Sequence, residues 1–181
     1  NKNATVKVMG IQPDDSSYTE LNKPVVIEGR MPQAANECVV DHSQAVNESI
    51  TIGSTVQFAP TVGEQPLSEI LNRDTYTVVG IVESPMFITA DRGQSTVGDG
   101  TIYCFFMIPQ ENFAYESYTE VYVQTDMSKE GISAFSDEYK NAMKEIETQL
   151  DELGSERVQN FEQTTLKDAR EELAQAKSDY E

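Results

Sequence analysis

The spacing of apolar residues changes near residue 128, and this change constrains the fold more than any other feature. Before it, short runs rich in Val, Ile, Thr, Tyr and Phe alternate with turn residues, as in sheet proteins. After it, apolar residues recur every three or four positions, which is the period of an amphipathic helix. The sequence therefore predicts an α+β chain, with a β-rich core over residues 1–128 and a helical region over residues 129–181.

We expect a small mixed sheet with short helices in the first part. Seven strands are predicted, over residues 5–11, 24–28, 37–40, 51–58, 75–83, 101–108 and 119–125. In the last run, Thr119, Val121 and Val123 alternate with more polar residues, which is typical of a strand with one covered face. Asp41 is placed to cap a brief helix over residues 42–47 that links two strands.

The second part is expected to hold two helices. The first is predicted over about residues 129–153, with Ser128 as its N-cap, Gly154 and Ser155 as its end, and an apolar face that packs across the sheet. The second is predicted over about residues 160–181. Its seam is Leu166, Ala169, Leu173, Ala176 and Tyr180, spaced alternately by three and four residues. This seam is typical of the start of a long coiled coil, whose partner helix comes from sequence outside this chain or from another chain.

The charge balance excludes some classes of partner. The chain has 31 acidic and 13 basic side chains and a formal net charge of −18, which argues against nucleic-acid binding. The longest apolar runs, such as residues 102–108, are far shorter than the roughly 20 residues that a membrane-spanning helix needs. Because the chain begins at Asn1 and stops inside a helical pattern, we expect it to be a piece of a larger protein.

Two cysteines and one histidine are the first candidates for chemistry. Cys38 and Cys104 each lie in an apolar, strand-like run, so they form either one disulfide or, as the runs favour, two buried thiols. His42 follows Cys38 by four residues, yet a strand would carry the thiol and the histidine would lie beyond its end. One histidine with two distant cysteines is too few ligands for zinc.

A glycine-rich segment over residues 93–100 is the second candidate. It lacks the Gly-Lys-Ser/Thr ending of a phosphate-binding loop, and Asp91 and Asp99 do not follow the calcium-loop spacing. A paired-carboxylate glycosidase would usually add aromatic platforms, and the chain has no Trp. By residue chemistry alone, the sequence predicts a non-enzymatic module without catalytic, cofactor-binding or metal-binding residues.

Several segments, taken in order, resemble one transporter family. They are EGRMP at 28–32, NECVV at 36–40, IGSTV at 52–56, YTVVGIV at 76–82, SPMFI at 84–88, RG at 92–93, GDG at 98–100 and YTEVY at 118–122. This set resembles the MacB-type extracytoplasmic core domain of FtsX-like ABC transporter permeases. The last segments look like its Gram-positive branch, and AREELAQAK at 169–177 resembles the ascending helix of that branch's coiled-coil insertion.

The resemblance implies a non-catalytic extracellular domain at the cell membrane. Such a domain couples ATP hydrolysis in the cytoplasm to conformational change outside, for substrate export, extraction or mechanical transmission. The implied partners are a cytoplasmic ABC ATPase subunit, reached through transmembrane segments outside this chain, a second permease copy, and an extracellular protein at the coiled coil.

Two alternatives from other classes stay open. One is a surface-anchored module that binds peptide or carbohydrate through residues 93–100 and through Tyr115, Tyr118 and Tyr122. The other is a secreted hydrolase that uses carboxylates, for which the isolated chain would have to be active.

Overall fold

The fold is described from a computed structural model of the chain. The structure describes residues 4–12, 21–43, 49–60, 66–114, 119–125 and 131–178. The chain separates into two compact units, Asn1–Tyr122 and Val123–Glu181, and each is described by itself.

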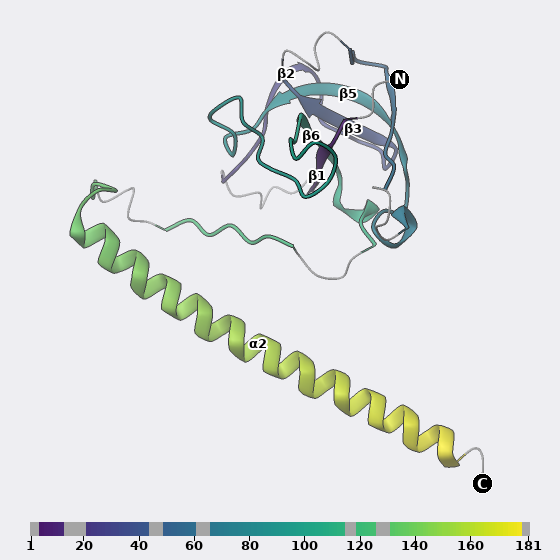
Figure 1. The fold of residues 1–181 in the computed structure, drawn as a ribbon, viewed down its shortest axis with the longest axis vertical. Coiled ribbons are helices and arrows are strands. Elements are labelled where there is room, and N and C mark those ends of the chain that lie inside the picture. The colour runs from purple at the N-terminus through teal and green to yellow at the C-terminus, as the bar shows by residue number, and fades with distance from the viewer. Residues whose placement is uncertain are drawn as a thin grey trace. The chain divides into compact units, whose positions relative to one another are not determined.

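The first unit is built on one mixed sheet, which confirms the predicted α+β class (Figure 1). Its strands are β1 (Val6–Ile11), β2 (Val25–Gly29), β3 (Glu37–Asp41), β4 (Thr55–Gln57), β5 (Thr75–Glu83) and β6 (Cys104–Pro109). The strand order is β1-β6-β3-β5-β2, and β4 also pairs with β5. The β1–β6 and β3–β5 pairs are parallel and the others are antiparallel. The 3-10 helix η1 (Leu67–Glu69) lies between β4 and β5, and the 3-10 helix η2 (Gln110–Asn112) directly follows β6.

Apolar side chains from the central strands form two clusters, one on each face of the sheet. Successive residues of a strand point to opposite faces, so β3 sends Cys38 and Val40 to one cluster and Val39 to the other. The larger cluster also takes Phe58 and Tyr76 from the β4–β5 side. The smaller cluster consists of Ile11, Val39, Val82, Phe105 and Met107, with Met9, Met31, Val79 and Phe87 packed against it. Strands β3 and β6 are thus buried on both faces, which explains their unbroken apolar runs.

Two facing glycines let β2 and β5 approach closely. Gly29 lies opposite Gly80 in the antiparallel ladder. A Cβ atom on Gly80 would lie 2.3 Å from the carbonyl oxygen of Arg30, and Gly29 has a φ of +77°. The backbones therefore approach closely at Gly80, whereas Gly53 lies in a turn with open space around it.

Two predicted strands and one predicted helix differ from the structure or lie partly outside the described residues. Strand β4 begins only at Thr55, because residues 51–54 turn back through a hydrogen bond from the Ser54 amide to the Thr51 carbonyl (2.9 Å). Residues 119–125 form no strand, since they pair with no described strand and Val121 is 78% exposed. In the predicted helix over residues 42–47, His42 is not helical and residues 44–48 lie outside the described residues.

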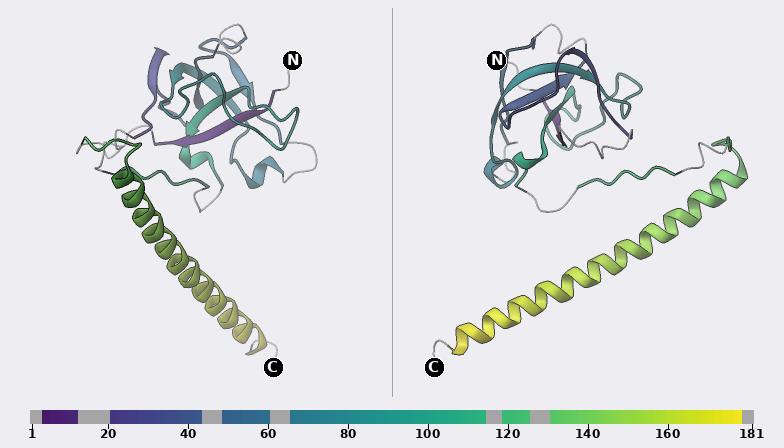
Figure 2. Two further views of the ribbon diagram at one scale, coloured as in Figure 1. Left: turned by 60° about the vertical axis from the view of Figure 1, so that its left-hand side comes forward. Right: turned by 180° about the vertical axis from the view of Figure 1, so that it is seen from behind.

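Within the described residues of the second unit, one helix stands where two were predicted. Helix α2 (Asp137–Ser178) runs for 42 residues through Gly154 and Ser155 without a break (Figure 2). A glycine inside a helix costs only about 1 kcal/mol relative to alanine, and strong helix formers on both sides outweigh this cost. The helix starts later than predicted, where the Ser136 hydroxyl accepts a hydrogen bond from the Tyr139 amide (3.1 Å). Ser128 lies outside the described residues.

The apolar side chains of the first predicted helix lie on α2, within the second unit. None of the described side chains of α2 is buried, and Leu150 and Leu153 are 43% and 49% exposed. The apolar face of α2 therefore remains accessible along its length.

Substitutions at Gly154 test the unbroken helix. A Cβ at this position meets nothing within 4 Å, so Gly154→Ala should stabilise α2 by about 1 kcal/mol and raise its melting temperature, followed by circular dichroism at 222 nm. Gly154→Pro should lower the helical signal, because proline removes a hydrogen bond and clashes inside a helix. If both variants match the parent chain, the helix is broken here, as the sequence first indicated.

Candidate functional site

A buried ion pair joins the end of the central strand β3 to the loop that follows β5. Asp41 is the last residue of β3, and its side chain is 1% exposed. The Arg92 guanidinium binds both of its carboxylate oxygens, with Nε 2.7 Å from Oδ2 and Nη2 3.0 Å from Oδ1. Arg92 Nη1 also donates to the carbonyl of Thr89. Two parallel charge-assisted bonds fix the direction as well as the distance of the arginine.

Two aromatic rings complete the surroundings of Arg92. Its guanidinium carbon lies 5.3 Å from the ring centroid of Phe87 and 5.9 Å from that of Phe105. These two rings stack on each other at 5.0 Å and 17°. The hydrogen bonds from Arg92 to Asp41 raise the pKa of Arg92, so the guanidinium stays charged. The cluster of Asp41, Arg92, Phe87 and Phe105, called here the arginine cluster, pins the 84–92 segment over the smaller apolar cluster.

Asp91 and Asp99, whose spacing does not fit a calcium loop, form hydrogen bonds within their own loop. Asp91 Oδ1 accepts a hydrogen bond from the Gly93 amide at 2.8 Å. Asp99 accepts from the Thr101 amide (3.0 Å) and from the Tyr103 hydroxyl (2.5 Å), and the Tyr103 bond is the main reason for its lowered pKa. Over the described residues, no group of three or more His, Cys, Asp or Glu side chains is arranged to hold a metal ion.

A second ion pair closes the turn between β2 and β3. Arg30 donates from Nη1 and Nη2 to the two oxygens of Glu37, at 2.7 and 2.5 Å. Glu37 Oε2 also accepts from the amides of Gln33 (2.8 Å) and Ala34 (3.3 Å). These bonds, with that of Arg30 the strongest, lower the pKa of Glu37 to about 2. The turn thereby links residues 28–32 to residues 36–40.

Cys38 and His42 do not meet. Cys38 is fully buried in the larger apolar cluster, and this burial raises the pKa of its thiol to about 12. His42 lies at the surface, where its Nδ1 is 2.9 Å from Glu83 Oε1. A thiol with so high a pKa supplies no thiolate near neutral pH, so this pair cannot act as nucleophile and base.

The strand register separates Cys38 from Cys104. Val39 of β3 lies opposite Met107 of β6, and Val40 lies opposite Phe106, so Cys38 is level with Ile108. Four strand residues span about 13 Å, which exceeds the roughly 7 Å limit for Cα atoms in a disulfide. Both cysteines are free and buried, which confirms the buried-thiol alternative.

The described aromatic residues of this region divide between core and surface. Phe105 and Phe106 are buried in the sheet, whereas Tyr103 is 46% exposed beside Asp99. Tyr122 is also half-exposed, and its hydroxyl donates to Glu120, which in turn pairs with Lys7 (3.0 Å). Tyr115 and Tyr118 lie outside the described residues.

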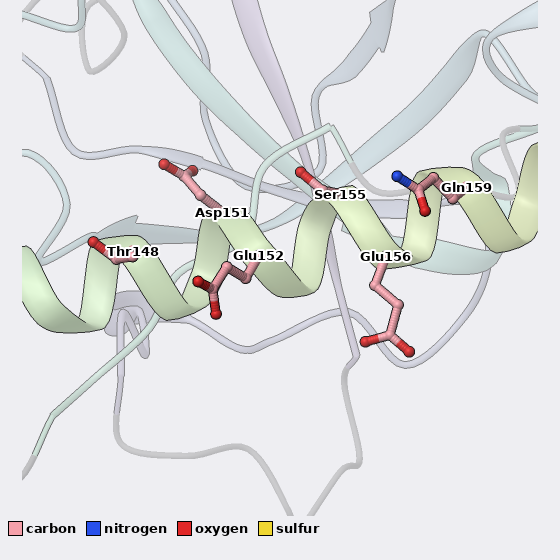
Figure 3. Close-up of a pocket in the computed structure, with 6 residues that line it drawn as sticks. All are labelled: Thr148, Asp151, Glu152, Ser155, Glu156 and Gln159. Atoms are coloured by element: carbon pink, nitrogen blue, oxygen red, sulfur yellow. The ribbon is translucent and has the colours of Figure 1, made fainter.

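A shallow surface hollow lies on a polar face of α2. It is lined by Thr148, Asp151, Glu152, Ser155, Glu156 and Gln159, all from this one helix (Figure 3). Three of these six side chains are carboxylates, and no other element encloses them. This arrangement is an open helix surface without the convergent polar groups of a ligand site.

Comparisons with protein-family models, with curated proteins and with solved structures found no match for this chain. Within the part of the chain that the structure describes, no helix has both the length and the hydrophobicity to cross a membrane.

The arginine cluster was missed from the sequence. Asp41 was interpreted as a helix cap, and Arg92 as part of a glycine-rich loop 51 residues away. One signal was present, because Asp41 directly follows three buried apolar residues of β3, and a buried acid requires a partner.

Removing one partner of the buried pair should destabilise the fold strongly. In Asp41→Asn, the Arg92 charge stays buried without its counter-ion, and we expect a loss of about 3 kcal/mol in the free energy of unfolding by urea. The matched control is Glu83→Gln, which removes the partner of the exposed His42 and should cost less than about 1 kcal/mol. Equal effects of the two variants would contradict the role assigned to the buried pair.

The pH dependence of stability should report on Glu37. Its folded pKa is about 2, below the ordinary 4.5, so its stabilisation is complete above about pH 4.5 and is lost as the pH falls towards 2. Glu37→Gln should lower the melting temperature at pH 7 and flatten the acid limb of the stability curve. Parallel acid limbs for the parent and the variant would show that Glu37 is not the titrating group.

Proposed function

We propose that this chain is the extracellular domain of an FtsX/MacB-like ABC transporter permease of the Gram-positive type with a coiled-coil insertion. In this role it is non-catalytic and couples ATP hydrolysis in the cytoplasm to movement outside the cell membrane. The observation that carries the proposal is α2, a single 42-residue helix without a buried face, in the same chain as a compact sheet unit.

The length of α2 suits a mechanical element. At 1.5 Å per residue, 42 residues span about 63 Å. None of its described side chains is buried. A stiff, accessible helix of this length transmits movement from its base to a partner at its far end.

The segments that resemble the family fall on scaffold positions of the sheet unit. Residues 28–32 and 36–40 are joined by the Arg30–Glu37 turn, and residues 76–82 lie within β5. Residues 84–88 and Arg92 belong to the segment that the arginine cluster pins. The ordered resemblance thus coincides with the interactions that make the unit rigid, as a domain that transmits force requires.

The chemistry of the described polar residues supports a non-catalytic role. The Cys38 thiol has a pKa of about 12, and the Asp91, Asp99 and Glu37 carboxylates are engaged in loop and turn hydrogen bonds. The partners under this proposal are a cytoplasmic ABC ATPase subunit, a second permease copy and an extracellular protein at the coiled coil.

One observation favours a second candidate, a surface-anchored module that binds peptide or carbohydrate. Ile88 is 92% exposed, although it stands between Phe87 and Arg92 of the arginine cluster. Tyr103, after the glycine-rich loop, is 46% exposed. A rigidly held loop that presents an apolar side chain is suited to ligand contact.

The coding sequence on both sides of this chain separates the two candidates. A permease requires an apolar span of roughly 20 residues before residue 1, and a returning helix followed by further spans after residue 181. A signal peptide and a wall anchor at these places would overturn the permease proposal in favour of the binding module.

A functional experiment then tests the mechanical role in the full-length permease with its ATPase. Gly154→Pro should abolish the transported or signalled output in cells while ATP hydrolysis continues, because proline interrupts the helix. Gly154→Ala is the matched control and should keep the output. Normal output from the proline variant would show that α2 is not the transmitting element.

A further inference from the structure

The apolar seam of α2 does not keep one heptad register. In residues 139–153 the sequence places it at Tyr139, Met143, Ile146, Leu150 and Leu153, with alternating steps of four and three residues. In residues 166–176 the sequence places it at Leu166, Ala169, Leu173 and Ala176, with alternating steps of three and four residues. Each stretch by itself follows the heptad pattern, but the two stretches belong to different registers.

Two wider steps join these stretches. Val158 follows Leu153 by five residues, and Leu166 follows Phe161 by five residues. Each of these steps moves the register by one residue in the same direction. Over the whole seam, ten steps cover 37 positions, which is a mean spacing of 3.7 residues.

This spacing turns the seam around the helix in the right-handed sense. A straight α-helix has about 3.6 residues per turn, and a left-handed coiled coil follows a repeat of about 3.5. A repeat of about 3.67 already gives a right-handed supercoil, and the repeat in α2 is slightly longer. At about 100° per residue, the seam turns by roughly 100° between its two ends. A partner in a left-handed coil would turn away from the seam instead of following it.

Short side chains lie where the spacing widens. Gly154 falls within the first wider step and Thr165 within the second. A Cβ atom on Gly154 would meet nothing within 4 Å. Small residues let two helix backbones approach closely in right-handed crossings. The seam is therefore not blocked at the two places where its register changes.

The seam is accessible, and its shape fits a helix. The side chains of Leu150, Val158, Phe161 and Leu173 are 43%, 58%, 72% and 58% exposed. The seam is a narrow row with about one apolar side chain per turn, and mostly polar residues flank it on both sides. Such a row is typical of a surface that packs against one other helix.

The charge of α2 favours a basic partner. Residues 137–156 contain seven acidic and two basic side chains, whereas residues 157–178 contain four of each. A second copy of the chain would bring another net charge of −18 to the seam. A helix that places Lys and Arg beside residues 137–156 would be attracted instead of repelled.

We infer that one helix with basic flanks, the returning helix of the proposed permease, covers this seam in a right-handed coil. The inference rests on the function proposed above and deepens it, because it gives that helix a handedness and a charge pattern. A returning helix runs antiparallel to α2, so its second half lies beside residues 137–156. That half is therefore the one that carries the Lys and Arg side chains.

The coding sequence after residue 181 tests the charge pattern. The second half of the returning helix should contain more Lys and Arg than Asp and Glu, and its apolar residues should recur at a spacing of about 3.7, above the 3.6 of a straight helix. A second half with a net negative charge, or an unbroken heptad repeat, would overturn the inference. Either finding would leave the permease proposal in place, because that proposal requires only the helix and the membrane spans.

Cysteine labelling in the full-length permease tests the handedness. A left-handed partner that kept the register of residues 139–153 would cover Asn160 and Thr164, whereas a right-handed partner covers Phe161 and Leu173. Each of the four residues is replaced by cysteine in turn, and maleimide labelling at that site is followed by mass spectrometry. Circular dichroism at 222 nm of the same variants of the 181-residue chain checks that α2 still forms.

The expected result is protection of the two seam positions only. Compared with the 181-residue chain, labelling of Phe161→Cys and Leu173→Cys in the permease should slow at least about tenfold, and that of the matched controls Asn160→Cys and Thr164→Cys less than about twofold.

Four other results contradict the inference. Protection of the two controls alone would show a left-handed partner, equal protection at all four positions would show a helix that is enclosed on every side, and no protection would show that no helix covers the seam. Protection in the 181-residue chain that grows with its concentration would assign the seam to a second copy. If the flanking membrane spans are present and one of these results is found, the permease proposal stands and this inference fails.

Discussion

A carboxylate without access to water at the end of a central strand must have a cation, and much of the sheet unit depends on this requirement. Asp41 obtains its cation from Arg92, which is 51 residues further along the chain. Holding Arg92 in place also holds Phe87 against Phe105, and these rings cover the smaller apolar cluster. One electrostatic constraint thus decides where the chain between β5 and β6 runs over the smaller apolar cluster.

The predictable parts of the fold are those that local pattern determines. The 75–83 strand was predicted with its exact bounds, because a long β-branched run with buried alternate residues has no competing interpretation. The 119–125 segment also alternates apolar and more polar residues, but it forms no strand. A strand needs a second strand to pair with, and the alternation of residues does not indicate whether one is present. The prediction that the helix ends at Gly154 was wrong. One glycine lowers helix stability only slightly, and the strong helix formers on both sides outweigh this cost.

The arginine cluster lay beyond local pattern for a related reason. Asp41 stands in no motif and Arg92 only in the two-residue RG segment, and their pairing exists only once β3 and β5 are parallel neighbours. The Arg30–Glu37 ion pair is intermediate in how well sequence could predict it. Its two residues are only seven positions apart, and both lie in segments that the sequence analysis singled out. The accuracy of sequence-based inference at a site therefore falls with the chain separation of the residues that form it.

The hydroxyl of Ser136 fixes the first turn of α2, and about 63 Å of helix extends from that point. By simple geometry, a tilt of about 10° at this cap displaces the far end of the helix by about 11 Å, given the 1.5 Å rise per residue. A change too small to disturb a hydrogen-bonded cap would therefore become a displacement comparable with the diameter of a helix.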